Sequence, residues 1–216
     1  MRNGCDAAPP GFVLLSEAVP DALLELRYFS GDNFVGERIK GYEEPAALLT
    51  GEAAAALKGA SDELLPRGYR LKIFDAYRPR MAVDHFLSWA KDPSDTRMKA
   101  IYYPELDKAE LFTRGYIAER SAHSRGSTVD LTLVDLRSGR EADMGGPFDY
   151  FGPLSRPDYP DISPEQHANR MLLREVMLAH GFLPLEEEWW HFTLANEPWP
   201  DTYFTFPVRN KAAADG

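Results

Sequence analysis

The chain has 216 residues, with 34 acidic and 24 basic side chains and a formal net charge of −10 at pH 7. This length is ample for one domain with a sizeable core, and no cluster of lysine and arginine among aromatic residues predicts a surface for nucleic-acid phosphates. The only cysteine, Cys5, excludes an intramolecular disulfide framework and a zinc site closed by thiolates.

Targeting and membrane signals are also missing from the sequence. No stretch approaches the length of a membrane span. The N-terminus has no basic region followed by a long apolar run, and the apolar residues 12–15 are too few for a leader. We therefore expect a single domain over residues 1–216, located in the cytoplasm, with no nucleic-acid or membrane partner. The oligomeric state stays open.

The first half of the chain alternates strand-like and helical patterns. Residues 12–28 are predicted as a strand, a turn and a second apolar stretch. Residues 45–65 are rich in alanine and leucine and are predicted as a helix that begins at Pro45. Residues 69–74 alternate as a strand, and the apolar positions of residues 79–90 recur at helical spacing after Pro79.

In the second half, residues 104–113 are predicted as a short helix and residues 127–133 as a strand. The latter alternates strictly between apolar and polar side chains, which predicts a half-buried strand with Asp130 directed away from the core. Residues 189–194 are aromatic and favour a further strand.

One more helix is predicted to begin at Ser163, where Pro164 follows at the first helical position and Gln166 completes a capping box. The helix should end at Gly181. Its apolar side is expected to hold four residues: Met171, Leu172, Val176 and Ala179.

The chemistry of the chain is concentrated in residues 121–130 and 188–191, which supply two imidazoles and two carboxylates. Three ligands, an open position for water and a spare carboxylate as base form a catalytic zinc site. Each residue taken singly could equally be a solvated or hydrogen-bonded side chain.

The spacing of Glu188 and His191 needs an explanation, because residues three apart on a regular strand point to opposite faces. Glu188 could lie in the turn before the strand, or a bulge could redirect it. Pro184 and the acidic residues 186–188 favour the turn.

Arg78 lies where the predicted strand 69–74 gives way to the following helix. It could be a surface charge or the partner of a carboxylate. It could also be a fixed cation that stabilises the negative charge developing on a reacting oxygen.

Several separated motifs resemble a known family. They are DAYRP at 75–79, SAHSRGSTVDLTL at 121–133, DMGGPFD at 143–149 and EWWHF at 188–192, and residues 26–36 are also similar. In this order they resemble the zinc D,D-peptidases, a family that includes the VanX-type D-alanyl-D-alanine dipeptidases and the VanY-type D,D-carboxypeptidases.

The resemblance extends from about residue 26 to residue 194 and implies an α+β fold. It implies a single domain with a central, mostly antiparallel sheet that carries the zinc site and flanking helices, as in Hedgehog domains and D,D-peptidases. It also implies the following residue roles: one zinc ion per chain bound by His123, Asp130 and His191, Glu188 as catalytic base, Arg78 as the oxyanion-stabilising cation, and Ser121, Asp149 and Tyr28 as lining of the substrate pocket.

The activity implied by the resemblance is hydrolysis of the free dipeptide D-alanyl-D-alanine. Asp149 could hold the substrate's ammonium group, and Ser121 with nearby backbone N–H groups could hold its carboxylate. One alternative is a D,D-carboxypeptidase that acts on longer muropeptides, and a more distant one is a zinc-bearing binding module without activity. The biological role, whether antibiotic resistance, dipeptide scavenging or wall turnover, stays open.

Residues 137–162 form a long stretch rich in glycine, proline, aspartate and aromatic residues. A loop of this length is unusual in a compact domain, so it is predicted either to cover the active site or to be an irregular structural excursion. The other histidines, His85, His167 and His180, are expected to lie outside the site. Trp189 and Trp190 are expected in the core or the pocket wall.

Overall fold

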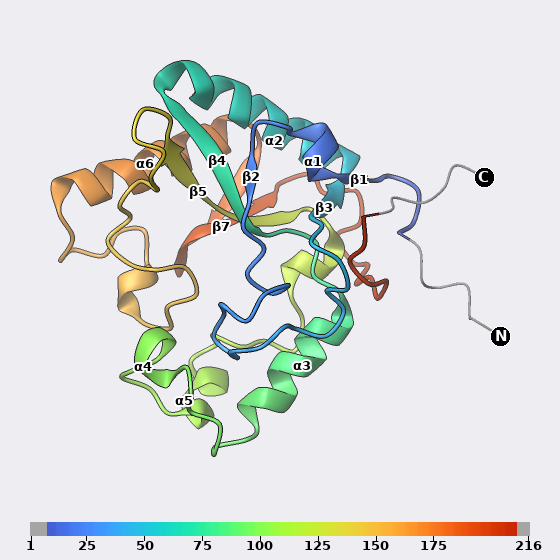
Figure 1. Ribbon diagram of the computed structural model, residues 1–216, viewed down its shortest axis with the longest axis vertical. Helices are drawn as coiled ribbons and strands as arrows, with labels where there is room; N and C mark the ends of the chain where they lie inside the picture. The colour runs from blue at the N-terminus through green and yellow to red at the C-terminus, as the bar shows by residue number, and fades with distance from the viewer. Residues whose placement is uncertain (1–7, 211–216) are drawn as a thin grey trace.

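The structure is a computed structural model that describes residues 8–210, so Cys5 and both ends of the predicted domain lie outside the described residues (Figure 1). The strands are β1 (Phe12–Leu14), β2 (Leu23–Leu24), β3 (Leu48–Thr50), β4 (Tyr69–Asp75), β5 (Thr128–Asp135), β6 (Phe182–Leu185) and β7 (Glu188–Leu194). The α-helices are α1 (Leu15–Ala18), α2 (Gly51–Leu64), α3 (Arg80–Ala90), α4 (Lys99–Tyr102), α5 (Lys108–Thr113) and α6 (Pro164–Ala179). The short 3₁₀ helices are η1 (Leu65–Arg67), η2 (Ala122–Arg125) and η3 (Pro153–Ser155).

A five-stranded sheet with the order β2-β4-β5-β7-β6 forms the centre of the fold. Its neighbouring strands are antiparallel except for β2, which runs parallel to β4. Helices α2 and α6 contact the sheet and each other, whereas α3, α4 and α5 gather at the opposite end of the molecule (Figure 1). The fold is therefore α+β with a mostly antiparallel sheet and flanking helices, as expected.

The central strand β5 differs from the prediction in its burial. It lies between β4 and β7, and every residue from Thr128 to Val134 is buried. The prediction of a half-buried strand was wrong because both faces of this strand are covered. Asp130 is on the face opposite Val129 and Leu131, as the alternation requires, but its side chain is only 2% exposed.

The helix predicted from Pro45 begins six residues later, at Gly51. Residues 48–50 pair instead with β1, with Thr50 opposite Phe12. The Thr50 side chain accepts a hydrogen bond from the Ala53 backbone N–H at 3.3 Å and caps the helix. Residues 48–50 therefore form a strand and not a helical turn, because they pair with β1, and the composition of the segment does not reveal this pairing.

The strand predicted at 69–74 and the helix predicted after Pro79 are confirmed as β4 and α3. The short helix predicted at 104–113 begins only at Lys108, where Asp107 and Glu110 form a capping box. The turns of helix in α1 and α4 were not predicted.

Helix α6 begins as predicted. Ser163 Oγ accepts from the Gln166 N–H at 3.2 Å, and Gln166 Oε1 accepts from the Ser163 N–H at 2.8 Å. Of the predicted apolar side, Val176 is buried and Leu172 packs partly buried against the core. Met171 and Ala179 were wrong, because the fully buried positions are Leu173, Val176, Met177 and the guanidinium-bearing Arg170.

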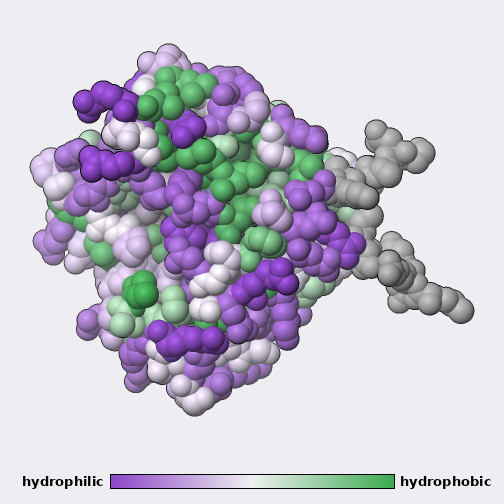
Figure 2. All heavy atoms as spheres, viewed as in Figure 1, coloured by the Kyte–Doolittle hydropathy of each residue, from purple (hydrophilic) through white to green (hydrophobic). Residues whose placement is uncertain are grey.

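The surface is mainly hydrophilic on the face shown in Figure 2, and the apolar atoms visible there gather mostly in its upper half. No helix among residues 8–210 is both long and apolar enough to cross a membrane.

Gly126 ends η2 in a left-handed conformation, with φ +86°. A Cβ atom there would lie 2.4 Å from Cζ of Phe12. The Phe12 ring cannot retreat easily, since it is stacked on Trp199 at 5.6 Å and meets Tyr77 edge-on at 5.4 Å. The close packing of Gly126 therefore fixes the end of the turn that carries His123.

We expect Gly126→Ala to lower the free energy of unfolding by about 2–4 kcal/mol, through left-handed strain and overpacking together. Gly139→Ala is a matched control, because Gly139 also has a positive φ, +70°, but has open space around it. The control should lose only about 1–2 kcal/mol. Chemical denaturation measures both values, and equal losses would contradict the packing argument.

Candidate metal centre and active site

One cavity of about 250 Å³ brings together all the predicted site residues. It lies where β5 and β7 meet the start of α3 and the residues that follow α5. Its lining includes all eight of them: Tyr28, Arg78, Ser121, His123, Asp130, Asp149, Glu188 and His191. Five separated parts of the sequence therefore converge on one site.

Three possible metal ligands lie together in the lining of this cavity. The antiparallel pairing of β5 with β7 places Asp130 directly opposite His191. Asp130 Oδ1 lies 3.0 Å from His191 Nδ1, and Asp130 Oδ2 lies 3.2 Å from His123 Nε2. One ligand atom from each residue lies within 4.8 Å of the others, and no other such group occurs in residues 8–210.

The His123 ring is oriented by a backbone contact. Its Nδ1 lies 2.7 Å from the carbonyl oxygen of Ala76, so Nδ1–H donates to this oxygen and Nε2 stays directed at Asp130 and His191. Two imidazole nitrogens and one carboxylate oxygen are ligands that zinc prefers. A metal-binding histidine commonly donates its other ring N–H to a carbonyl, as His123 does to Ala76.

The charges around Asp130 keep its carboxyl group ionised, as a metal ligand requires. Burial alone would raise the pKa of its carboxyl group, but the charges and hydrogen bonds of His123 and His191 outweigh burial and hold the pKa below its usual value. Asp130 is therefore a carboxylate, which is the form that binds a cation.

Glu188 reaches the site through an irregularity in the sheet and not, as favoured from the sequence, through the preceding turn. It is the first residue of β7. Leu185 pairs with Glu188 but Pro184 pairs with Phe192, so residues 189–191 have no partner on β6. This bulge lets Glu188 and His191 face the same cavity, with Glu188 Oε2 3.6 Å from His191 Nδ1.

The Glu188 side chain is 25% exposed and lines the cavity together with Leu185 and Tyr116. Burial raises the pKa of its carboxyl group, and the nearby His191 opposes this shift. A carboxyl group whose pKa is raised accepts and returns a proton more readily near neutral pH.

Arg78 is both a partner of carboxylates and part of the cavity wall. Its Nε donates to Asp75 Oδ2 at 2.9 Å, and its Nη2 lies 3.5 Å from Asp130 Oδ2. The guanidinium also packs over the ring of Tyr28, 4.8 Å from its centroid. These contacts hold a positive charge at a fixed place beside the possible metal ligands.

Sequence reasoning missed the role of Asp75 and its neighbour Tyr42. Asp75 is 1% exposed; its Oδ1 accepts from the Tyr42 hydroxyl at 2.7 Å, and its Oδ2 lies 3.6 Å from His123 Nδ1. Asp75 therefore connects Arg78 to His123. The sequence did contain an indication of this role, because Asp75 is a carboxylate at the end of the alternating strand, three positions before Arg78.

Asp149 lines the same cavity in an unusual conformation. Its φ is +62°, and it is the only non-glycine residue among those described with a positive φ. Its Oδ2 accepts from the buried Tyr28 hydroxyl at 2.8 Å. Burial, and then the charge of Asp130, raise the pKa of Asp149 well above its usual value, so a cation beside it would be stabilising.

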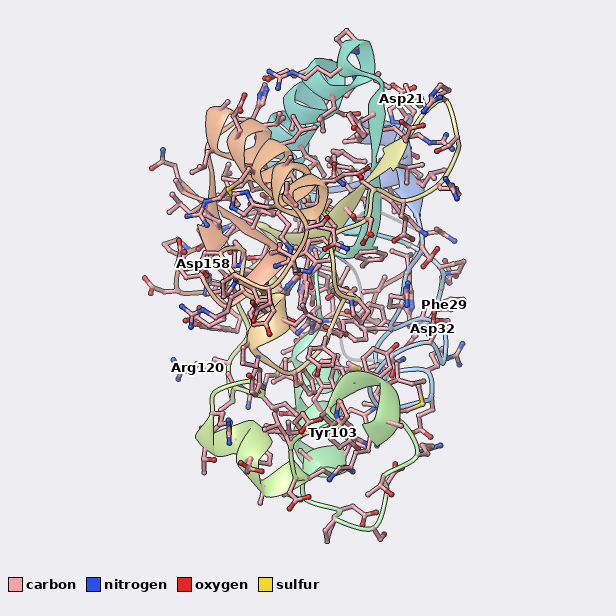
Figure 3. All side chains as sticks on the ribbon, turned by 90° about the vertical axis from the view of Figure 1, so that its left-hand side faces the viewer. Asp21, Phe29, Asp32, Tyr103, Arg120 and Asp158 are labelled. Atoms are coloured by element: carbon pink, nitrogen blue, oxygen red, sulfur yellow. The ribbon has the colours of Figure 1, made fainter. Side chains whose placement is uncertain are left out.

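Of the long segment 137–162, Asp149 and Phe151 line the cavity. These two residues belong to the wall of the site, and whether the segment covers the site stays a prediction. The lining also includes Ser121, whose Oγ lies 3.5 Å from Arg78 Nη1, and Arg120, which projects outward in Figure 3.

The remaining histidines lie outside the cavity lining, as predicted, and Trp189 and Trp190 also lie outside it. His85 contacts Glu37 at 3.3 Å, and His180 contacts Glu63 at 2.9 Å. Trp189 and Trp190 are 4% and 1% exposed and belong to the core.

Comparison with known proteins agrees with this geometry. The family model for peptidase M15, described as D-ala-D-ala dipeptidase, matches residues 9–209. A D-alanyl-D-alanine dipeptidase of Streptomyces coelicolor is 45% identical over 91% of this chain and 98% of its own length. One of Enterococcus faecalis is 42% identical over 92% of this chain and 98% of its own.

A solved structure of a mutant of the vancomycin-resistance D,D-pentapeptidase VanY in complex with Zn(II) covers 73% of this chain and 78% of that chain. Its TM-score is 0.42 at 13% identity, a likeness too weak to support a conclusion. The family match extends over nearly the whole chain, and the two curated relatives cover almost all of their own length. The chain therefore belongs to the D-ala-D-ala dipeptidase family of metallopeptidases.

Proposed function

We propose that this chain is a zinc-dependent dipeptidase that hydrolyses free D-alanyl-D-alanine. The observation that carries the proposal is the convergence of a possible metal-binding triad, a spare carboxylate, a fixed guanidinium and a second buried carboxylate on one small cavity. The relatives named D-alanyl-D-alanine dipeptidase support the choice of substrate.

The residues proposed to hold one zinc ion are His123 through Nε2, Asp130 through its carboxylate, and His191 through Nδ1. When bound, zinc would polarise a peptide carbonyl and lower the pKa of a water molecule towards about 7. The Ala76 carbonyl would keep the His123 ring in the tautomer that this binding needs.

In the proposed reaction Glu188 acts as base and then as acid. It accepts a proton from the water that attacks the peptide carbonyl, and it delivers this proton to the departing amine. Arg78 lies beside the triad and stabilises the negative charge that develops on the carbonyl oxygen.

The two ends of the dipeptide are proposed to be recognised separately. Asp149, oriented by Tyr28, binds the free ammonium group by a charge-assisted hydrogen bond. Ser121 with backbone N–H groups binds the carboxylate. A cavity of about 250 Å³ suits a short substrate, whereas a longer muropeptide would also have to occupy the neighbouring pocket that shares Tyr116 and Glu188 with it.

We also propose that residues 1–216 form a single domain. In support, buried residues from Ala8 to Val208 belong to one continuous core. The cytoplasmic location stays a prediction from the sequence.

Glu188→Ala should lower kcat by about 10³-fold or more while the protein retains one zinc ion per chain, because Glu188 is proposed as base and not as ligand. Metal analysis and steady-state kinetics measure the two properties. Glu187→Ala, at the exposed neighbouring position, should leave both unchanged. Loss of zinc from Glu188→Ala would show that Glu188 is a ligand.

Arg78→Ala should lower kcat by about 10²–10³-fold with a smaller change in KM, since its interaction strengthens as negative charge develops. Arg80→Ala is the matched control, because Arg80 pairs with Asp84 on the exposed side of α3. If KM alone rises in Arg78→Ala, Arg78 binds substrate and does not act on the transition state.

N-acetyl-D-alanyl-D-alanine and a pentapeptide ending in D-alanyl-D-alanine should both have a kcat/KM at least about 10²-fold below that of the free dipeptide. Acylation removes the charge that Asp149 is proposed to bind and adds bulk to a small cavity. Asp149→Asn should impair hydrolysis of the free dipeptide and keep its zinc. Equal cleavage of all three substrates would favour the carboxypeptidase.

A further inference from the structure

Arg170 is a buried arginine whose role the proposed reaction does not use. It lies on α6 and is 1% exposed. Each of its guanidinium nitrogens donates to a different backbone carbonyl: Nε to Met144 at 2.6 Å, Nη1 to Arg156 at 2.6 Å and Nη2 to Leu154 at 2.9 Å. The planar guanidinium therefore binds three backbone carbonyls of one segment, residues 144–156.

The charge of Arg170 is not balanced by an ion pair. No carboxylate of residues 8–210 lies within 4.0 Å of its nitrogens. Burial lowers the pKa of the guanidinium to about 10, and the more distant Asp143 opposes this shift. Arg170 is thus still charged at neutral pH, and a buried charge of this kind is retained only with well-formed hydrogen bonds.

The three carbonyls bracket Asp149. Met144 precedes Asp149 by five residues, and Leu154 follows it by five. Two further side chains of α6 hold the start of the segment, since Gln166 Nε2 donates to Asp143 Oδ2 and Asn169 Nδ2 donates to Asp143 O, both at 2.9 Å. The segment, drawn in gold, runs beside α6 in Figure 1.

Asp149 depends on such support. Its φ of +62° is unfavourable for a residue other than glycine, and such a conformation persists only where the surroundings impose it. Within the cavity its carboxylate has the Tyr28 hydroxyl as hydrogen-bond donor. The two ends of the segment must therefore be fixed for the carboxylate to keep its place.

We propose that Arg170 is a positioning residue that sets the selectivity for a free ammonium group, by fixing the segment that presents Asp149. Arg170 does not line the cavity, so it acts through this segment and does not touch the substrate. The inference rests on the proposed function, in which Asp149 binds the ammonium group of the dipeptide.

Arg170→Lys tests the proposal, because lysine keeps the charge but cannot reproduce the planar fork that spans three carbonyls. We expect KM for the free dipeptide to rise about 10-fold while kcat changes less than about 3-fold, and the preference over N-acetyl-D-alanyl-D-alanine to fall by a similar factor. Zinc content should stay at one per chain. Hydrogen exchange of the amides in residues 144–156 should become faster.

Arg67→Lys is the matched control, since Arg67 is an exposed arginine whose partners are Glu63 and Glu175. It should leave KM, selectivity and exchange unchanged. A merely structural role of Arg170 would lower the stability of the fold without changing the selectivity of the folded enzyme. Unchanged KM and selectivity in folded Arg170→Lys would overturn the proposal.

A double-mutant cycle with Asp149→Asn separates this inference from the proposed function. When Arg170→Lys is added to the Asp149→Asn variant, KM should change less than about 2-fold, because the positioned charge is gone. Additive effects would overturn the positioning role. An unchanged KM in Asp149→Asn alone would instead contradict the ammonium site of the proposed function.

If Arg170→Lys does not fold, Asn169→Ala decides the question. It removes the neighbouring contact to the Asp143 carbonyl on the less buried side of the same helix. A fall of about 2–3-fold in the preference for the free dipeptide over N-acetyl-D-alanyl-D-alanine supports the positioning of Asp149 by α6. An unchanged preference overturns it.

Discussion

The antiparallel register of β5 on β7 is the constraint on which the site depends. It places Asp130 opposite His191, and their side chains meet at 3.0 Å. A shift of one residue would turn Asp130 to the other face of the sheet and replace it with an apolar neighbour. The register is held by burial on both faces of β5, since Val129 and Leu131 are fully buried on the face opposite Asp130. The hydrophobic core therefore determines where the possible ligands meet.

The other groups of the site are held around this pair by individual contacts, in addition to the packing of the core. The bulge in β7 turns Glu188 towards His191. The turn η2, closed by Gly126, and the Ala76 carbonyl orient His123. Asp75 fixes Arg78. Asp75 also lies beside His123, so these contacts form a connected set that holds the site on rigid elements.

The sequence predicted best where local chemistry decides the outcome. The start of α6 follows from Ser163 and Gln166, and β4 follows from strict alternation. The site residues could be named because their motifs are specific and lie in order along the chain. Prediction failed where strand pairing decides. β3 forms because β1, distant in the sequence, pairs with it, and Glu188 is redirected by an irregular pairing with the neighbouring strand β6 that the residue pattern does not reveal. The apolar side of α6 was misjudged because a buried arginine occupies part of it.

The balance of charge in the site explains why these parts suit a metal and an ammonium group together. Four carboxyl groups, those of Asp75, Asp130, Asp149 and Glu188, lie buried or half-buried beside the half-buried guanidinium of Arg78. Burial raises the pKa of three of them, Asp75, Asp149 and Glu188, because negative charge is unfavourable in a poorly solvated cavity. A divalent cation at the triad and a substrate ammonium at Asp149 would each stabilise the charged form of the carboxyl groups beside it. Asp149 is fixed by the Tyr28 hydroxyl and by its constrained backbone, so a cation bound at the triad would not easily draw its carboxyl group away from Tyr28.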